Sequence, residues 1–354
     1  MLSKLQKSLK QKQALLVSDR LNIRYLSGFH GSNALILITK KQASLLTDFR
    51  YSATVKSLPK QIRASITTDP STEILNILKR EKIKKLRLEA ENITIARLKR
   101  LKKSLPGITL VAGESLIEPL RVSKTAEEIV LIKKAQQITE KTFKHILSKI
   151  KTGITEIQLA HDLEKTAMDF GAEKNSFPPI VAFGKNSACP HHESGNAKLK
   201  KGDIILLDMG FKYKGYCSDM TRMLFTAPPT PLQKEVYMTV LKAQTEAIKI
   251  LKAGIKGGKV DKTARDIIKK AGYGDKFGHG LGHGVGLNVH EVPYLSTKYQ
   301  KPLPLNAVVT VEPGIYLENS FGVRIEDMVL VERDKTTNLT KIPKKIKDLI
   351  LSIS

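Results

Sequence analysis

The chain has 354 residues, of which 41 % are hydrophobic and 27 % are charged, as is usual for a folded protein. This length exceeds one typical domain, so we expect two domains of unequal size. No stretch approaches the roughly 18 uncharged apolar residues of a membrane-spanning helix, and we expect no membrane segment. The two cysteines, Cys189 and Cys217, are too few for a disulfide framework and favour a reducing cytoplasm.

The net charge of +26 raises the question of nucleic-acid binding, because basic proteins often bind nucleic acids. The lysines, however, are dispersed singly and in pairs, without a basic tail. Tryptophan is absent and aromatic residues make up 5 % of the chain, a poor supply of platforms for stacking bases. We therefore expect no specific nucleic-acid partner, and at most a weak attraction to acidic surfaces.

The first third of the chain alternates short apolar runs with basic helical patterns. Leu2, Leu5 and Leu9 share one helical face, which predicts an amphipathic first helix. A transit peptide is the alternative, but arginine is absent from this stretch. Residues 34–38 and 44–46 are expected to be strands, and residues 73–85 a helix.

The pattern changes at a proline-containing connector, residues 118–124. Ser123 or Thr125 precedes Glu127 and Glu128, which is the signal of a helix N-terminus. We therefore predict two domains, residues 1–121 and residues 122–354, within an α+β and α/β architecture.

The second domain is expected to begin with helices and then to become rich in strands. An amphipathic helix is predicted over residues 155–170, and Gly171 follows where a C-terminal cap belongs. Residues 181–331 have strand character, interrupted by a helical stretch over about residues 231–271.

Two aspartates lie in neighbouring strand-like runs, Asp208 after four apolar residues and Asp219 in the next run. A hairpin centred near Tyr213 and Lys214 would place the two carboxylates directly opposite each other, about 5 Å apart. Carboxylates this close repel each other unless a cation lies between them. A metal ion is the economical explanation of the pair.

The same arrangement recurs near the C-terminus with two glutamates. A hairpin centred near Asn319 and Ser320 sets Glu312 opposite Glu326. The period-two alternation of a strand also places Arg324 on the face of Glu326, where its charge would keep that carboxylate ionised and oriented.

Histidines lie between the two hairpins in two clusters. His279, His283 and His290 belong to a glycine-rich stretch, and the glycines make a helical zinc motif improbable. We expect an irregular, closely packed loop or strand edge there. His191 and His192 follow Pro190 in a loop that, taken alone, is more often surface than site.

The ordered set of two carboxylates, a glycine-loop histidine and two further carboxylates resembles the pita-bread metallopeptidases, namely aminopeptidase P, prolidase and, more distantly, methionine aminopeptidase. Residues 22–29 and 46–51 resemble the creatinase-type N-terminal domain, which methionine aminopeptidases lack. The resemblance implies a working peptidase. A peptide- or nucleic-acid-binding protein on a peptidase scaffold is the alternative, and the full set of matching ligands counts against it.

The resemblance implies a site with two divalent ions. Asp219 and Glu326 would bridge them, Asp208 would complete one, and His283 with Glu312 would complete the other. These oxygen-rich ligands suit Mn²⁺ or Co²⁺, with Zn²⁺ and Fe²⁺ as alternatives. Two such ions activate a water molecule and stabilise the tetrahedral intermediate.

The resemblance also implies roles for the remaining residues. Glu312 is expected to shuttle the proton, and His191 and His290 to stabilise the oxyanion. His279, Tyr316 and Arg324 are expected at the substrate. For His192 we expect a solvent-facing position, and the stretch from Phe177 to Pro179 is either pocket wall or simple packing.

Substrate specificity is expected to concern proline. Removal of one residue from peptides that begin Xaa-Pro is favoured, and cleavage of Xaa-Pro dipeptides is the alternative. The motifs do not separate the two activities, and the N-terminal domain is expected to limit peptide length. A homodimer is expected from the resemblance.

Overall fold

A computed structural model describes residues 2–353, and the chain divides between Arg121 and Val122 into two compact units. The division falls within the proline-containing connector. Among the described helices, none is long and apolar enough to cross a membrane.

The first unit contains one six-stranded sheet with the order β4-β3-β2-β1-β5-β6. Strands β1, β2 and β3 pair antiparallel, whereas β4, β5 and β6 join their neighbours in parallel. The strands are β1 (Gln13–Val17), β2 (Ala34–Ile38), β3 (Ala43–Thr47), β4 (Ile62–Ile66), β5 (Lys85–Glu89) and β6 (Thr109–Gly113). The helices are α1 (Leu2–Ser8), α2 (Arg20–Ser27), α3 (Pro70–Arg80), α4 (Ile95–Ser104) and α5 (Glu118–Val122).

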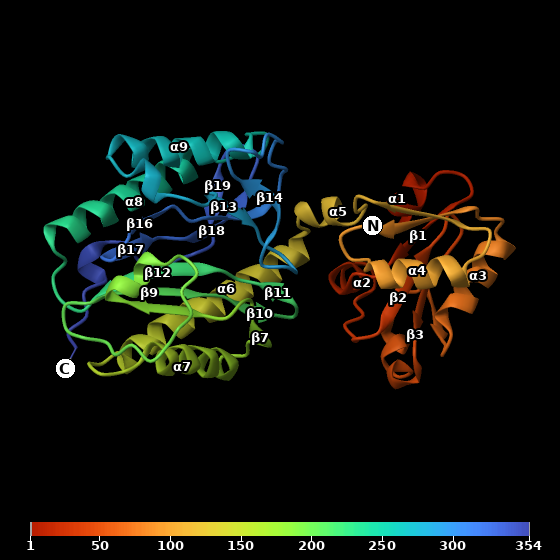
Figure 1. The fold of residues 1–354 in the computed structure, drawn as a ribbon, viewed down its shortest axis with the longest axis horizontal. Coiled ribbons are helices and arrows are strands. Elements are labelled where there is room, and N and C mark those ends of the chain that lie inside the picture. Colours follow the sequence, from red (N-terminus) through yellow and green to blue (C-terminus); the bar gives the residue numbers. More distant parts are fainter. Residues whose placement is uncertain (1, 354) are drawn as a thin grey trace. The chain divides into compact units, whose positions relative to one another are not determined.

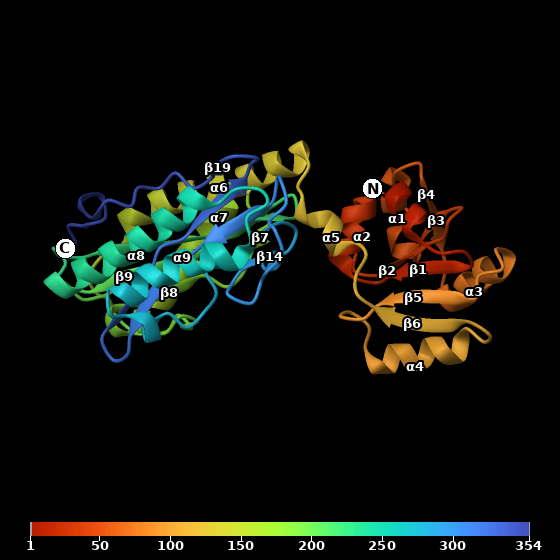
Figure 2. The ribbon, with the colours of Figure 1, turned by 90° about the horizontal axis from the view of Figure 1, so that it is seen from above.

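Helices cover both faces of this sheet, because successive strand residues point to opposite sides. Leu16 of β1 packs with buried side chains of α3 and α4. Its neighbours Leu15 and Val17 pack instead with Leu5 of α1 and Ile23 of α2. Figure 2 shows α4 on one side of the sheet and α1 and α2 on the other.

The sequence-based predictions for this unit are largely confirmed. The first helix, the strand over residues 34–38 and the strand around residues 44–46 are all present. The helix predicted over residues 73–85 is wrong at its end, since α3 stops at Arg80. Lys82 has a left-handed backbone (φ 57°), and Lys85 already pairs with Gln13 in the sheet.

The second unit has two pairs of helices with strands between them (Figure 1). Helices α8 and α9 lie on one side of the strands, and α6 and α7 lie on the other. The bounds are α6 (Ala126–Ile146), α7 (Glu156–Asp169), α8 (Pro231–Ile250) and α9 (Gly257–Lys270). The predicted helix starts are confirmed, because Thr125 forms a capping box with Glu128, and Thr155 forms one with Gln158.

The strands of this unit form four small sheets. Their orders are β12-β9-β8, β14-β13-β15-β18-β19, β16-β17 and β11-β10-β7. The bounds are β7 (Lys174–Asn175), β8 (Ile180–Phe183), β9 (Ile204–Met209), β10 (Phe211–Tyr213), β11 (Tyr216–Cys217), β12 (Met220–Phe225), β13 (Gly282–Gly284), β14 (Glu291–Leu295), β15 (Val308–Val311), β16 (Gly314–Leu317), β17 (Phe321–Arg324), β18 (Asp327–Val331) and β19 (Thr336–Asn338).

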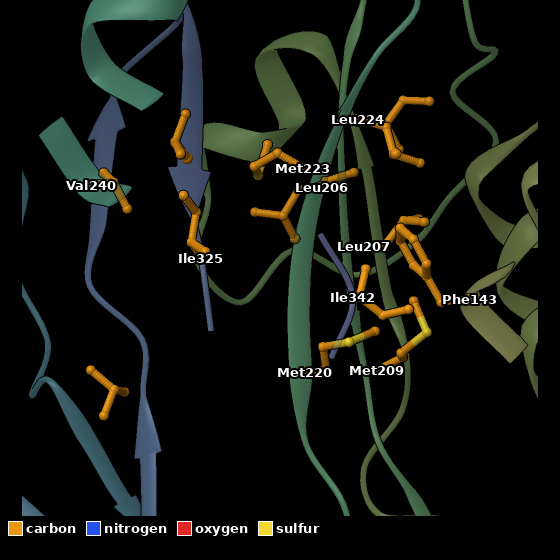
Figure 3. Packing of buried hydrophobic residues seen from close by; sticks show 14 of the residues in the cluster. Phe143, Leu206, Leu207, Met209, Met220, Met223, Leu224, Val240, Ile325 and Ile342 are labelled. Carbon is orange, nitrogen blue, oxygen red and sulfur yellow. The ribbon is translucent and has the colours of Figure 1, made fainter. Parts of the chain in front are cut away.

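The central strands β9 and β12 bury both of their faces. Figure 3 shows Leu207 beside Phe143 of α6, whereas Leu206 and Met223 lie toward Ile325 on the other side. Strands buried on both faces form a rigid scaffold, because close-packed interiors resist deformation. The polar residues at the ends of these strands are therefore held in fixed positions.

A candidate two-metal active site

The first pair of candidate ligands lies on the hairpin formed by β9, β10, β11 and β12. Its turn residues Lys214 and Gly215 have φ values of 46° and 86°, as a two-residue hairpin turn requires. The turn is thus centred one residue later than the sequence predicted. Asp208 pairs with Thr221, and Asp219 lies two residues away on the opposing strand.

The predicted direct pairing of Asp208 with Asp219 is therefore wrong. A register shift of two residues keeps a side chain on the same face of a sheet. The two carboxylates become diagonal neighbours, which are still within reach of each other.

The second pair of carboxylates has the predicted register. Val311 pairs with Asp327 and Gly314 pairs with Arg324. The common register of these flanking pairs places Glu312 opposite Glu326, and this prediction is confirmed.

The glycine-rich stretch is mostly irregular and closely packed, as predicted, but its short strand β13 pairs with β14 on one side and with β15 on the other, so it is not a sheet edge. A Cβ atom on Gly282 would lie 2.1 Å from the carbonyl oxygen of Thr310, and one on Gly284 would lie 2.5 Å from that of Val292. His283 lies between these glycines in β13. The lack of side chains lets its backbone approach the glutamate strand.

All five predicted metal ligands line one pocket of about 860 Å³. Nε2 of His283 lies 3.2 Å from Oε1 of Glu312 and 3.7 Å from Oδ2 of Asp219. One ligand atom from each of Asp219, His283 and Glu326 lies within 4.8 Å of the others. Donor atoms at these separations can share a small cation.

The electrostatics of the carboxylates also favour a cation. Burial raises the pKa of Asp219 and of Glu326 well above the ordinary values, and the neighbouring carboxylates raise them further. Burial also opposes the charge of Glu312, but the hydrogen bond and charge of His283 outweigh it and lower that pKa to about 2. Excess buried negative charge of this kind is relieved by divalent metal ions.

Asp208 carries the clearest sign of an additional ligand. Its Oδ2 accepts a hydrogen bond from Arg324, whereas its buried Oδ1 has no hydrogen-bond partner among the residues that the structure describes. A buried carboxylate oxygen without a partner is costly. The residues present therefore fit a dinuclear centre with oxygen-rich ligands.

Arg324 has a different partner from the one that the sequence predicted. Its Nη2 donates to Asp208 at 2.5 Å and its Nη1 donates to the hydroxyl of Tyr316 at 2.9 Å. Glu326 is instead held by Thr221, whose hydroxyl donates to Oε2 at 2.8 Å. The interpretation of Arg324 as the direct partner of Glu326 is thus wrong, because its guanidinium reaches the other hairpin, although its charge acts to lower the pKa of Glu326 as predicted.

Two threonines beside the ligands were missed by the sequence analysis. Thr310 donates to Oε1 of Glu312 and accepts from the backbone N–H of His283. Thr310 lies two residues before Glu312, which follows β15, and Thr221 lies two residues after Asp219, which precedes β12. The period-two alternation could have identified both.

His279 and Tyr316 are joined to each other and to Arg324. Nε2 of His279 lies 2.9 Å from the hydroxyl of Tyr316. Burial lowers the pKa of His279 and raises that of Tyr316 to about 12. His279 lines the pocket, whereas Tyr316 is not among the residues that line it. The hydroxyl of Tyr316 contacts Arg324 and His279, two residues that do line the pocket.

The two histidines with expected oxyanion roles both line the pocket. The ring centroids of His290 and His283 are 4.4 Å apart. Burial, followed by the charge of His283, lowers the pKa of His290. His191 lies on the loop after η4 (Gly184–Ala188), and Phe177 and Pro178 line the same pocket.

The prediction that His192 faces solvent is wrong. Its side chain is 18 % exposed, and Nε2 lies 2.8 Å from Oε2 of Glu156. Glu156 is distant in sequence and begins a helix, so no local pattern pointed to this pair.

A second missed pair holds the glycine-rich stretch. Arg265 donates to the carbonyl oxygens of Phe277 and His279. Its Nε and Nη2 also donate to the two carboxylate oxygens of Asp261. Oδ1 of Asp261 also accepts from the backbone N–H of Leu281. This pair fixes the approach of the chain to His283.

Fold and site together define a metallopeptidase. The profile of Metallopeptidase family M24 matches residues 130–333, and that of the Creatinase/Prolidase N-terminal domain matches residues 1–123. The chain belongs to metallopeptidase family M24, and the expected creatinase-type domain and pita-bread domain are confirmed.

Solved relatives cover nearly the whole chain. The crystal structure of an X-Pro aminopeptidase from Thermotoga maritima is 38 % identical, covers 94 % of this chain and 96 % of its own, and has a TM-score of 0.88. The Xaa-Pro dipeptidase from Bacillus anthracis is 36 % identical, with 98 % of both chains covered and a TM-score of 0.95. The prolidase from Pyrococcus furiosus is 32 % identical, covers 97 % of this chain and 100 % of its own, and has a TM-score of 0.89. The Bacillus subtilis peptidase YqhT is 37 % identical over 94 % of both chains.

Proposed function

We propose that this metallopeptidase hydrolyses the Xaa-Pro bond at peptide N-termini, with two divalent metal ions in the pocket. The observation that carries the proposal is the convergence of four buried or half-buried carboxylates and one imidazole, together with Oδ1 of Asp208, which is buried and lacks a hydrogen-bond partner among the described residues. Such a set suits hydrolysis better than passive peptide binding.

The ligand assignment rests on the resemblance to family M24 and on the pocket that the five residues share. Asp208, Asp219, His283, Glu312 and Glu326 would together hold the two ions. Bound ions would activate water and stabilise the charge that develops on the substrate carbonyl. Mn²⁺ or Co²⁺ suits the oxygen-rich ligands best.

The protein's own side chains would supply the proton transfers. The hydrogen bond and charge of His283 keep the carboxylate of Glu312 ionised, and this carboxylate would take a proton from water. It would then pass the proton to the departing prolyl nitrogen. His191 and His290 would donate hydrogen bonds to the carbonyl oxygen as it becomes negative. His279 and Arg324 would contact the substrate.

Selectivity for proline is supported by the shape and chemistry of one pocket wall. Phe177, Pro178, Pro179 and Ile180 give this wall an apolar surface next to the carboxylates. An apolar surface suits the pyrrolidine ring, since pockets of this kind bind by burial of apolar area.

Two activities remain as candidates, and peptide length separates them. The T. maritima relative is named an aminopeptidase and the B. anthracis relative a dipeptidase, at nearly equal identity. We propose the aminopeptidase activity, with Xaa-Pro dipeptide cleavage as the alternative. The test compares kcat/KM for an Xaa-Pro dipeptide and an Xaa-Pro-Xaa tripeptide with added Mn²⁺. Preference for the tripeptide is expected, and exclusive cleavage of the dipeptide would support the alternative.

A homodimer in a reducing cytoplasm completes the proposal. The two described cysteines, exposed Cys189 and buried Cys217, are both free thiols, in keeping with that setting. Sedimentation of the purified protein measures the assembly directly, and a monomer at all concentrations would contradict it.

A further inference from the structure

We propose that Glu156 is the positioning residue for the segment that carries His191, and that it affects catalysis through His191. The inference rests on the proposed function, in which His191 donates to the substrate carbonyl. Glu156 is the first residue of α7 and lies outside the ligand set.

The position of the His191 side chain is set by the backbone of the loop that carries it. The residue is exposed on the pocket wall. Within the part of the chain that the structure describes, its ring makes no hydrogen bond. It lies in a loop after the short helix η4, where no strand or long helix fixes the chain. An exposed ring on such a loop is well placed only if the loop itself is held.

Glu156 holds this loop at both ends. Its side chain is fully buried (0 % exposed). Oε1 accepts hydrogen bonds from the backbone N–H of Phe183 at 2.8 Å and from Nδ2 of Asn186 at 2.9 Å. Oε2 accepts from Nε2 of His192 at 2.8 Å and from the backbone N–H of Gly195 at 3.1 Å. One carboxylate thus joins residues on either side of His191.

The adjacent histidines have different surroundings. His192 contacts the buried carboxylate, and its side chain is 18 % exposed. His191, one residue earlier, keeps its ring nitrogens available to the pocket. The hydrogen bond between the His192 ring and Glu156 therefore restricts the backbone next to His191. A displacement of about 1 Å in a catalytic group can cost about 100-fold in rate.

The other side of the loop rests on the second catalytic hairpin. Oγ of Ser187 accepts from the backbone N–H of Gly322 at 2.9 Å, and Nη1 of Arg324 donates to the carbonyl oxygen of Pro190 at 3.3 Å. A Cβ on Gly322 would lie 2.2 Å from the carbonyl oxygen of Ser187, so the contact is close. The loop lies between Glu156 and this hairpin. Losing the side-chain contacts of Glu156 would loosen one side of the loop, where the backbone N–H of Ile157 still donates to the carbonyl oxygen of Gly195.

The test begins with Glu156→Gln. The amide keeps one acceptor oxygen but replaces the other with an NH2 donor, so only one of the two pairs of donors around Glu156 keeps its acceptor. We expect kcat to fall about 10- to 100-fold, with KM within about twofold and with unchanged metal content.

Glu89→Gln is the matched control. Glu89 is also buried (4 % exposed) and accepts several hydrogen bonds, but it lies in the sheet of the first unit. Its donors are the backbone N–H groups of Ser18 and Asp19, Oγ of Ser18 and Nδ2 of Asn22. We expect this variant to lose thermal stability without losing kcat. An equal loss of kcat in the control would overturn the inference.

Introducing Glu156→Gln into the His191→Ala variant distinguishes a positioning role of Glu156 from general structural damage. If Glu156 acts through His191, Glu156→Gln should lower kcat in the native chain but have no further effect in His191→Ala. The same fold-loss in both backgrounds would overturn the inference. If Glu156→Gln fails to fold, His192→Ala takes its place in the same comparison with His191→Ala. The rate of His192→Gln should then lie above that of His192→Ala, because the glutamine amide can donate a hydrogen bond to Glu156.

An NMR measurement on the metal-free protein needs no activity. With labelled histidine, Glu156→Gln should shift the ring signals of His191, whereas Glu89→Gln should leave them in place. Unmoved His191 signals would overturn the inference. If native protein cleaves no Xaa-Pro peptide, the proposed function fails, and these spectra still decide whether Glu156 positions His191.

Discussion

Arg324 and Asp208 join the two catalytic hairpins, with Nη2 of Arg324 at 2.5 Å from Oδ2 of Asp208. Both side chains are nearly buried, with exposures of 4 % and 11 %. The guanidinium also donates to the hydroxyls of Tyr316 and Thr221. It therefore orients the predicted ligand Asp208 and also Thr221, which donates to the predicted ligand Glu326. The position of Asp208 therefore depends on a residue of the other hairpin.

Arg324→Lys should weaken metal binding and slow hydrolysis, each by about 10- to 100-fold. A lysine ammonium cannot reproduce the fork that contacts Asp208, Tyr316 and Thr221 together. Metal titration and steady-state kinetics measure the two effects. Tyr316→Phe removes one of the three contacts of the guanidinium, together with the contact of the hydroxyl to His279, and should have the smaller effect on metal binding; the reverse order would contradict the orienting role.

Gly282→Ala should destabilise the second unit by about 1–3 kcal/mol or more, and should lower metal affinity through His283. The added methyl would lie 2.1 Å from the backbone oxygen of Thr310, which cannot move away freely. Gly278→Ala is the matched control, since no atom lies within 4 Å of its added Cβ. Chemical unfolding compares the two, and equal stability would contradict the close packing.

The buried pair of Arg222 and Asp327 should be important for the stability of the second unit. Both side chains are fully buried, and Arg222 also donates to the carbonyl oxygen of Glu326. Asp327→Ala should cost about 3–5 kcal/mol, because it leaves a buried charge unpaired. Asp266→Ala, which breaks the exposed pair with Lys262, should cost at most about 1 kcal/mol. Similar free energies of unfolding for the two variants would contradict this difference.

The metal-free protein should become less stable as pH rises, through Asp219 and Glu326. Their pKa values are raised in the folded state, so their contribution is fully present below the ordinary carboxyl pKa of about 4 and is lost as pH rises through the folded value. Asp219→Asn removes one of these charges. Its Tm should therefore exceed that of native metal-free protein by a margin that widens as pH rises above the ordinary carboxyl pKa of about 4. A constant margin would contradict the pKa directions.

Much of the site could be predicted because each hairpin is local. Glu312 and Glu326 are separated by a short turn, and the alternation of the strands was enough to set them opposite each other. Asp208 and Asp219 were misplaced by two residues because the turn could be centred on either side of Lys214, and the left-handed backbone of Gly215 decides it.

Partners distant in sequence could not be predicted from local patterns. Arg324 was assigned to Glu326, its neighbour on the strand, whereas tertiary packing pairs it with Asp208. The burial of His192 against Glu156 has the same cause. The alternation of side chains along a strand and the residues of a turn predict the structure of a single hairpin. Contacts between a hairpin and another hairpin or helix depend instead on how the layers of the fold pack together.

The initial rate of Xaa-Pro-Xaa hydrolysis, measured while Mn²⁺ is added to metal-free protein, tests the central claim most directly. We expect the native chain to gain activity up to two bound ions per chain. Asp219→Asn should reduce the metal affinity by at least about 100-fold, since mutating a residue that only hydrogen-bonds to a metal ligand already reduces affinity by about 10- to 100-fold. This variant should remain inactive. Two bound ions without cleavage of any Xaa-Pro peptide, or equal rates in the two proteins, would contradict the account.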